Sequence, residues 1–340
     1  MRELLAHYGR KKFTHTAVGG GSDVGVGEQR DGVVEPIDSG RLPVGDGHEI
    51  YWEIVGNPDG LPAVVLHGGP GSGCDLARRG WFDPDEHRAV LFDQRGCGRS
   101  LPLADTADAD LGTNTTDHLI ADIEALRAHL AIDRWMVVGS SWGVTLGLAY
   151  AQRHPDRVTR MVLAAVTAGR RLETDWITRD MRRVFPQEWD EFVSLVPPSD
   201  RDGDLTAAYA RLLSDPDPAL TDRAAAAWCR WEDTHVSLAP GAGPRLQLMS
   251  RQRQQAFARL VTHYWSHGCF LDDAPILEHM DVLRGVPAVL IHGRHDVSSP
   301  LETAWELYRR WPASELVVLD DAGHGGGSMT DEIIRAINRR

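Results

Sequence analysis

The chain has 340 residues, of which 42% are hydrophobic, and its 36 Lys and Arg against 49 Asp and Glu give a formal net charge of -13. This length and composition predict one large domain or one domain with a sizeable insertion, and the absence of a dense basic block disfavours nucleic-acid binding. No apolar run approaches the roughly 18 residues of a membrane span and the N-terminal segment has no apolar signal core, so we expect a cytoplasmic protein without membrane association.

The predicted elements begin after an N-terminal arm. Residues 1–35 are rich in Gly and polar residues, which is typical of a flexible segment. Over residues 36–167 strand and helix patterns alternate, and short apolar runs such as PAVVLHG are typical of buried parallel strands. Strands are predicted at 48–56, 62–68, 88–93, 135–139 and 160–165, and helices at 116–130, with Thr116 as N-cap, and from about residue 142.

This alternation is interrupted once. Residues 168–270 have the pattern of helices broken by loops, and the alternation resumes over residues 271–340. The pattern predicts an α/β fold with a mostly parallel central sheet and one helical insertion between core strands. The resumed elements are strands at 287–293 and 315–320 and helices at 301–311 and 331–338.

The segment VVGSSWGVTLGLAY (137–150) places serine at a strand-to-helix corner between two glycines. Gly139 and Gly143 frame the pattern Gly-x-Ser-x-Gly, which is the nucleophile elbow when a strand precedes it and a helix follows. The central residue of the pattern is Ser141, so we predict that Ser141 is the nucleophile and that Ser140 is not. The helix N-terminus there also favours a developing negative charge.

A serine nucleophile needs a base, and in this kind of fold the acid and then the histidine follow the serine along the chain. RHD, ending in Asp296, and DAGHGGG, containing His324, each follow a late predicted strand. Because open α/β sheets build their sites at the carboxyl ends of strands, we predict Asp296 as the acid and His324 as the base. Asp320 and Asp321 are alternatives for the acid, although they share the histidine's strand and would need a sharp reversal.

Two further loops follow strands on the same edge. HGGPG (67–71) predicts an oxyanion hole in which the N–H groups of Gly69 and Trp142 are the donors. No Gly-Lys-Ser/Thr follows it, which disfavours a phosphate-binding loop. Two roles are open for DQRGCGRS (93–100), namely catalysis and bracing of the oxyanion loop. We favour bracing, with Asp93 and Arg95 as internal ion-pair or hydrogen-bond partners and not as reactants.

With these motifs assembled, the chain resembles the proline iminopeptidases, or prolyl aminopeptidases, of the α/β-hydrolase superfamily. The resemblance runs from about Ser39 to near the C-terminus. It implies a Ser141–His324–Asp296 triad, a helical cap at 168–270 over the active site, a small peptide or peptide-like substrate, and no metal or organic cofactor. The motifs that carry it are GHEIYWEIVGNPDGLPAVVLHGGPGSG, FDQRGCGRS, NTTDHLIADIEALRAHL, GSSWGVTLGLAYAQRHP and IHGRHD.

The substrate pocket departs from the family pattern. The resemblance implies two cap glutamates that hold the free amine of the substrate; Glu232 matches one, but Val261 stands where the other is expected. Threonine and isoleucine replace aromatic residues of the proline pocket, and a serine replaces a pocket cysteine. The positions that the resemblance assigns to substrate binding are Glu232, Val261, Tyr264, Trp265, Thr167, Ile177, Thr178 and Ser299.

These observations predict a proline iminopeptidase-like serine hydrolase that cleaves an amide bond through an acyl-enzyme. The altered pocket motivates an alternative, a related hydrolase recruited to another amide or ester hydrolysis or to acyl transfer in specialised metabolism. A non-enzymatic scaffold is disfavoured because Ser141, Asp296, His324 and the HGGPG loop are all present. The sequence indicates no particular oligomeric state.

Overall fold

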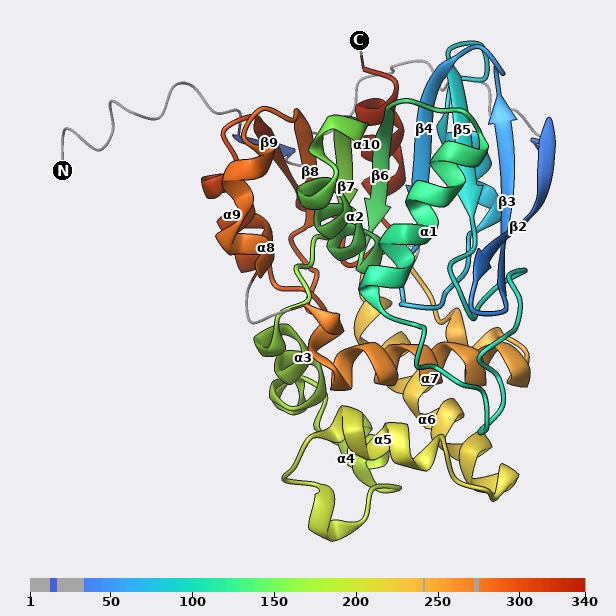
Figure 1. The fold of residues 1–340 in the computed structure, drawn as a ribbon. Helices are drawn as coiled ribbons and strands as arrows, with labels where there is room; N and C mark the ends of the chain where they lie inside the picture. Colours follow the sequence, from blue (N-terminus) through green and yellow to red (C-terminus); the bar gives the residue numbers. More distant parts are fainter. Residues whose placement is uncertain (1–12, 17–33, 241, 272–274, 340) are drawn as a thin grey trace.

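One twisted sheet organises the molecule. The structure, a computed structural model, describes residues 13–16, 34–240, 242–271 and 275–339. In these residues the strand order is β1-β9-β8-β7-β6-β4-β5-β3-β2, and β3 alone runs antiparallel to its neighbours (Figure 1). The strands are β1 (Phe13–Thr16), β2 (Asp38–Gly45), β3 (His48–Gly56), β4 (Leu61–Leu66), β5 (His87–Phe92), β6 (Trp135–Ser140), β7 (Val158–Ala164), β8 (Ala288–Gly293) and β9 (Ser314–Leu319).

Helices cover both faces of the sheet. The helices α1 (Thr116–His129), α2 (Trp142–Arg153) and α9 (Leu301–Arg310) pack their apolar side chains on one face, together with the short α8 (Pro275–Glu278). On the other face, α10 (Met329–Ile337) packs through a separate apolar cluster. The central strands are therefore buried on both sides, which explains their continuous apolar sequences.

Two local predictions are corrected by the structure. The N-cap of α1 is Thr115, whose hydroxyl accepts the His118 N–H at 3.4 Å, and the predicted cap Thr116 instead donates to the Cys269 carbonyl at 2.5 Å. Within the predicted arm, Phe13–Thr16 form β1 parallel to β9, while residues 1–12 and 17–33 lie outside the described part.

Helices α3 to α7, which lie between β7 and β8 in the chain, form a helical layer beyond the carboxyl ends of the parallel strands (Figure 1). It has its own aromatic core, in which Phe192 stacks between Tyr209 and Trp231 with ring centroids 4.6 and 5.2 Å away. This layer therefore forms a second packed unit over the edge of the sheet where the site lies. Its helices are α3 (Arg171–Thr178), α4 (Pro186–Val193), α5 (Leu205–Leu212), α6 (Pro218–Val236) and α7 (Arg251–Ser266). None of the helices in the described ranges combines the length and apolar character needed to cross a membrane.

Candidate active site

The corner between β6 and α2 forces Ser141 into an unusual backbone conformation. Its φ of 56° and ψ of -123° are costly for a residue with a side chain, by about 1–3 kcal/mol. The two flanking glycines are required sterically, because a Cβ at Gly143 would lie 2.1 Å from the Leu66 carbonyl oxygen and one at Gly139 would lie 2.4 Å from that of Gly143. The turn therefore projects Ser141 away from the sheet, with the N-terminus of α2 directly behind it.

The structure brings Ser141, His324 and Asp296 into one hydrogen-bonded chain. The Nε2 atom of His324 lies 2.9 Å from Ser141 Oγ. Its Nδ1 atom lies 3.0 and 3.2 Å from the two carboxylate oxygens of Asp296. The three residues follow β6, β9 and β8, which are parallel strands of the same sheet with β7 between β6 and β8, so their carboxyl ends bring the residues to the same edge.

The two alternative acids are engaged elsewhere. Asp321 accepts hydrogen bonds from the N–H and hydroxyl of Ser328, at 3.0 and 2.7 Å, where α10 begins. Asp320 forms an ion pair with Arg294 at 2.8 Å. Asp296 is therefore the carboxylate that contacts the histidine.

The surroundings of His324 and Asp296 shift the pKa values of the two residues in opposite directions. Burial alone would raise the pKa of the Asp296 carboxyl, but the charge and hydrogen bond of His324, with the Ser299 N–H at 2.8 Å, hold that pKa below its usual value. Burial alone would lower the pKa of the His324 ring, but the charge and hydrogen bond of Asp296, with a contribution from Glu232, raise it above 6.5. The acid stays ionised and the ring is a stronger base than an ordinary histidine.

This arrangement predicts a pH dependence. His324 can accept a proton only when neutral, and a raised pKa keeps the ring protonated to higher pH. We therefore expect kcat/KM to fall with decreasing pH through a midpoint above 6.5, the usual imidazole value. The profile is best measured with an uncharged ester, whose own ionisation does not contribute. A midpoint well below that value would contradict the proposed His324–Asp296 pairing.

Gln94 connects the two loops that carry the predicted oxyanion donors. Its side-chain amide donates to the His67 carbonyl at 3.1 Å, and its amide oxygen accepts the Trp142 indole N–H at 3.0 Å. The backbone N–H of Gln94 also donates to His67 Nε2 at 3.0 Å. These bonds hold the HGGPG loop, where Gly69 has a φ of +111°, against the start of α2.

The prediction for Asp93 and Arg95 is confirmed. Arg95 forms a buried ion pair with Asp122 at 2.6 Å, and Asp93 pairs with Arg99 at 2.7 Å. Both charges are therefore satisfied within the fold, and Asp93 also accepts the Cys74 N–H, at 2.6 Å, just after the HGGPG segment.

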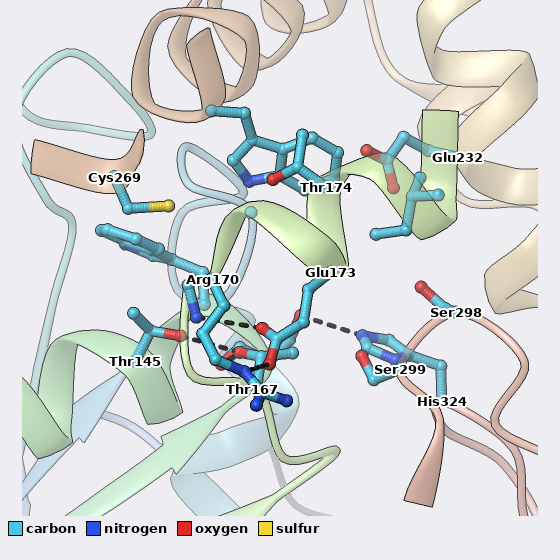
Figure 2. Close-up of a pocket in the computed structure, with 16 residues that line it drawn as sticks. Thr145, Thr167, Arg170, Glu173, Thr174, Glu232, Cys269, Ser298, Ser299 and His324 are labelled. Carbon is cyan, nitrogen blue, oxygen red and sulfur yellow. Dashed lines mark hydrogen bonds and ion pairs between the residues drawn. The ribbon is translucent and has the colours of Figure 1, made fainter. Parts of the chain in front are cut away.

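Ser141 is one of the residues that line a cavity. Figure 2 shows this cavity in close-up, with Glu232 and His324 at its wall. Of the predicted substrate-binding positions, the residues at its wall are Glu232, Trp265, Thr167, Ile177 and Ser299. Other wall residues, such as Thr174 and Ser298, were not predicted, because the segment after β7 and the loop after β8 meet only in the fold. The remaining lining residues are Gly69, Trp142, Thr145, Gly169, Arg170, Glu173, Thr174, Cys269, Ser298 and His324.

Three predicted pocket residues do not line this cavity. Val261 is fully buried in the apolar core of the helical layer. Tyr264 packs edge-on against the Trp142 ring at 5.0 Å, and Thr178 donates to the Thr174 carbonyl at 2.9 Å. These side chains pack behind the residues that line the cavity. A residue that aligns with a substrate-binding position of the family therefore does not always line the cavity in this protein.

The two carboxylates of the cavity differ in their surroundings. Glu173 uses both oxygens within the fold: one accepts the N–H groups of Ala168 and Gly169, both at 3.0 Å, and the other accepts from Arg170 and Thr303, at 3.1 and 2.8 Å. Glu173 is thus saturated and holds the loop after β7.

Glu232 is the carboxylate available to a ligand. It lies in α6 at the cavity wall, and the ring of His235 on the same helix is 3.6 Å away. Burial raises the pKa of Glu232 to about 7, while burial lowers the pKa of His235 to about 3, so this histidine adds no charge near neutral pH. A cationic amine in the cavity would favour the ionised form of Glu232.

The side chains at this site can supply a nucleophile, a base and a carboxylate. In the described residues, no three His, Cys, Asp or Glu side chains are grouped so that they could hold a metal ion. The chemistry that the site can perform with these groups is acyl transfer to a serine.

Comparison with known proteins agrees with this geometry. The family model for the alpha/beta hydrolase fold matches residues 62–326. A probable proline iminopeptidase of Streptomyces coelicolor is 48% identical over 307 residues, covering 89% of this chain and 94% of that protein. A proline iminopeptidase of Arabidopsis thaliana is 42% identical over 293 residues, covering 86% and 76%. The crystal structure of a Mycobacterium smegmatis proline iminopeptidase is similar in fold, with a TM-score of 0.58, 22% identity and coverage of 88% and 96%.

The fold and the site define a hydrolase with the α/β-hydrolase architecture. Within that class, the chain belongs to the proline iminopeptidase family, since relatives of this family share 40–48% of its residues over most of its length.

Proposed function

We propose that this protein is a serine aminopeptidase that removes the first residue from a small peptide or peptide-like amide. The observation that carries the proposal is the Ser141–His324–Asp296 hydrogen-bond chain, with distances of 2.9 and 3.0 Å, opening on a cavity that also contains Glu232. The chain supplies a nucleophile, and Glu232 supplies a partner for a free amine.

In the proposed reaction, Ser141 Oγ attacks the carbonyl carbon of the first residue while His324 Nε2 takes the hydroxyl proton. Asp296 orients the ring and stabilises its charged form. The N–H groups of Gly69 and Trp142 stabilise the oxyanion of the tetrahedral intermediate. His324 then gives its proton to the leaving amine, and water, activated by the same ring, hydrolyses the acyl-enzyme.

The substrate preference of this enzyme need not be that of its relatives, which are named proline iminopeptidases. Trp142, Ile177 and Trp265 contribute large apolar side chains to the cavity wall, but Thr167 and Ile177 stand where the resemblance places aromatic residues. A proline ring gains most from flat apolar surfaces, so we propose weaker selectivity for proline. The same replacement of aromatic residues supports the second candidate, an enzyme recruited to another amide, ester or acyl-transfer reaction.

We place the enzyme in the cytoplasm and propose no nucleic-acid or membrane partner. All four cysteines, Cys74, Cys97, Cys229 and Cys269, are free thiols, which fits a reducing compartment.

The experiment that tests the proposed function compares kcat/KM for a free-amine aminoacyl amide, its N-acetylated analogue and a simple ester. We expect the free-amine amide to be the best of the three, and replacement of Glu232 by Gln to reduce this preference by about tenfold or more, because the amine then loses its charged partner. The effect should be mainly on KM, since the group binds substrate and does not react.

The matched control is Glu188→Gln, which removes an exposed carboxylate from α4 in the same cap. This variant should retain the wild-type preference. If the N-acetylated amide or the ester is preferred by the wild type, and Glu232→Gln changes nothing, the aminopeptidase proposal is wrong and the second candidate stands.

A further inference from the structure

Three hydroxyl groups at the wall of the cavity lack a hydrogen-bond partner among the described residues. They belong to Thr174, Ser298 and Ser299, whose exposed fractions are 7%, 5% and 6%. Figure 2 shows the three side chains around the cavity that contains Glu232 and His324. The three hydroxyl oxygens are not sealed inside the protein but face the cavity, where a polar atom of a ligand or of water can pair with them.

The other hydroxyls at the wall are already paired. Thr145 and Thr167 share a hydrogen bond of 2.9 Å, and Thr167 also donates to the Ser141 carbonyl at 3.0 Å. These two threonines therefore support the nucleophile turn. The unpaired set is confined to Thr174 and the two serines.

The unpaired hydroxyls are held on elements that are fixed to each other. Thr174 lies in α3, whereas Ser298 and Ser299 follow β8. The indole N–H of Trp176 in α3 donates to the Val297 carbonyl at 2.7 Å, which ties that helix to the serine loop. The Ser299 N–H also donates to Asp296, so the loop is anchored to the acid that orients His324. Hydroxyls fixed in this way are preorganised for a ligand.

We propose that the cavity selects substrates whose first residue carries a hydroxyl side chain, with serine and threonine as the simplest cases. The inference rests on the proposed aminopeptidase function, in which Glu232 holds the amine of that same residue. A side-chain hydroxyl can both donate and accept, and it therefore pairs with the hydroxyls of Thr174, Ser298 and Ser299. An apolar side chain of equal size leaves them unpaired, and a site built for a hydroxyl discriminates strongly against such an analogue.

The test uses two substrates that differ by one group, seryl-amidomethylcoumarin and its 2-aminobutyryl analogue, in which a methyl replaces the hydroxyl. We expect kcat/KM of the wild-type enzyme to be about 100-fold higher for the seryl substrate. Equal rates, or a preference for the aminobutyryl substrate, would overturn the proposal without any variant being made.

Variants then assign the preference to particular residues. We expect Thr174→Val, Ser298→Ala and Ser299→Ala each to lower the seryl-to-aminobutyryl ratio, mainly through a higher KM for the seryl substrate. The matched control is Ser199→Ala, at an exposed hydroxyl in the cap, which should leave the ratio unchanged. If all three pocket variants retain the wild-type ratio, the three hydroxyls do not determine the preference for the substrate side chain, and the proposal is wrong.

The same measurements separate this inference from the proposed function. If prolyl, seryl and aminobutyryl amides are all cleaved with a free-amine requirement but without preference for the hydroxyl, the aminopeptidase stands and the inference is wrong. If no free-amine amide is cleaved in preference to its N-acetylated form, the proposed function itself has failed and the inference fails with it.

Discussion

Replacement of Ser141 by Ala is expected to lower kcat by about 10⁴- to 10⁶-fold, because no other group at the site can form the acyl-enzyme. The fold should survive, since alanine has the smaller side chain and the turn is held by backbone contacts of Gly139 and Gly143. Labelling by a fluorophosphonate probe should disappear together with turnover. Circular dichroism and thermal unfolding of the variant give the check that the loss is chemical.

The neighbouring serine is the matched control for this variant. Ser140 is the last residue of β6 and pairs in register with Ala164 of β7, whereas Ser141 lies in the turn and is 2.9 Å from His324. Ser140→Ala should therefore keep labelling and most of the activity. Labelling that persists in Ser141→Ala, or that is lost in Ser140→Ala, would show that the nucleophile has been assigned to the wrong residue.

The sequence predicted the buried part of the sheet well and its edges poorly. The strands β4 to β9 are short apolar runs. A continuous apolar run of this length is typical of a strand buried on both faces, so these strands could be predicted from the sequence. The edge strand β2 was not predicted, because its residues alternate between exposed and half-buried and include Gly40 and Pro43. Its position depends on pairing with β3, where Gly40 faces Trp52, and that contact lies outside any local pattern.

The residues proposed for the chemistry lie in short motifs after strands, and this is why the sequence alone could nominate them. The steric need for glycine at 139 and 143 leaves a visible pattern, and chain order then reduces the choice of base and acid to a few residues. The cavity wall is different, because α3 and the loop after β8 meet through the Trp176–Val297 hydrogen bond. Nothing in the local sequence of Thr174 or Ser298 indicates that contact.

Position in the family pattern was also an incomplete guide to the pocket. Val261 was predicted to stand at a substrate-binding position, yet its side chain packs inside the cap core. A glutamate introduced there would have to bury a charge among apolar neighbours, unless the cap opened toward the cavity. The number of carboxylates in the cavity therefore depends on how α7 packs as well as on which residue stands at position 261.

Replacement of Asp296 by Asn is expected to lower kcat by about 10⁴-fold while changing KM little. The two oxygens of Asp296 serve two donors, His324 Nδ1–H at 3.0 Å and the Ser299 N–H at 2.8 Å. Asparagine has one oxygen, so it can accept from only one of these two donors. If its NH₂ group faces His324, the ring must take the tautomer in which Nδ1 is the acceptor. In that tautomer Nε2 carries the proton and cannot accept one from Ser141.

The same variant should also shift the pH profile. The Asp296 charge raises the pKa of His324, so its removal lowers that pKa, and the residual activity should persist to lower pH than in the wild type. Asp321→Asn is the matched control: it weakens the contact with Ser328 at the start of α10, so it should reduce thermal stability and leave kcat near the wild-type value. An inactive Asp321→Asn beside a fully active Asp296→Asn would mean that the acid is Asp321. The shift in the profile separates a lost charge from a merely distorted site, because a distorted site lowers the rate at every pH without moving the midpoint.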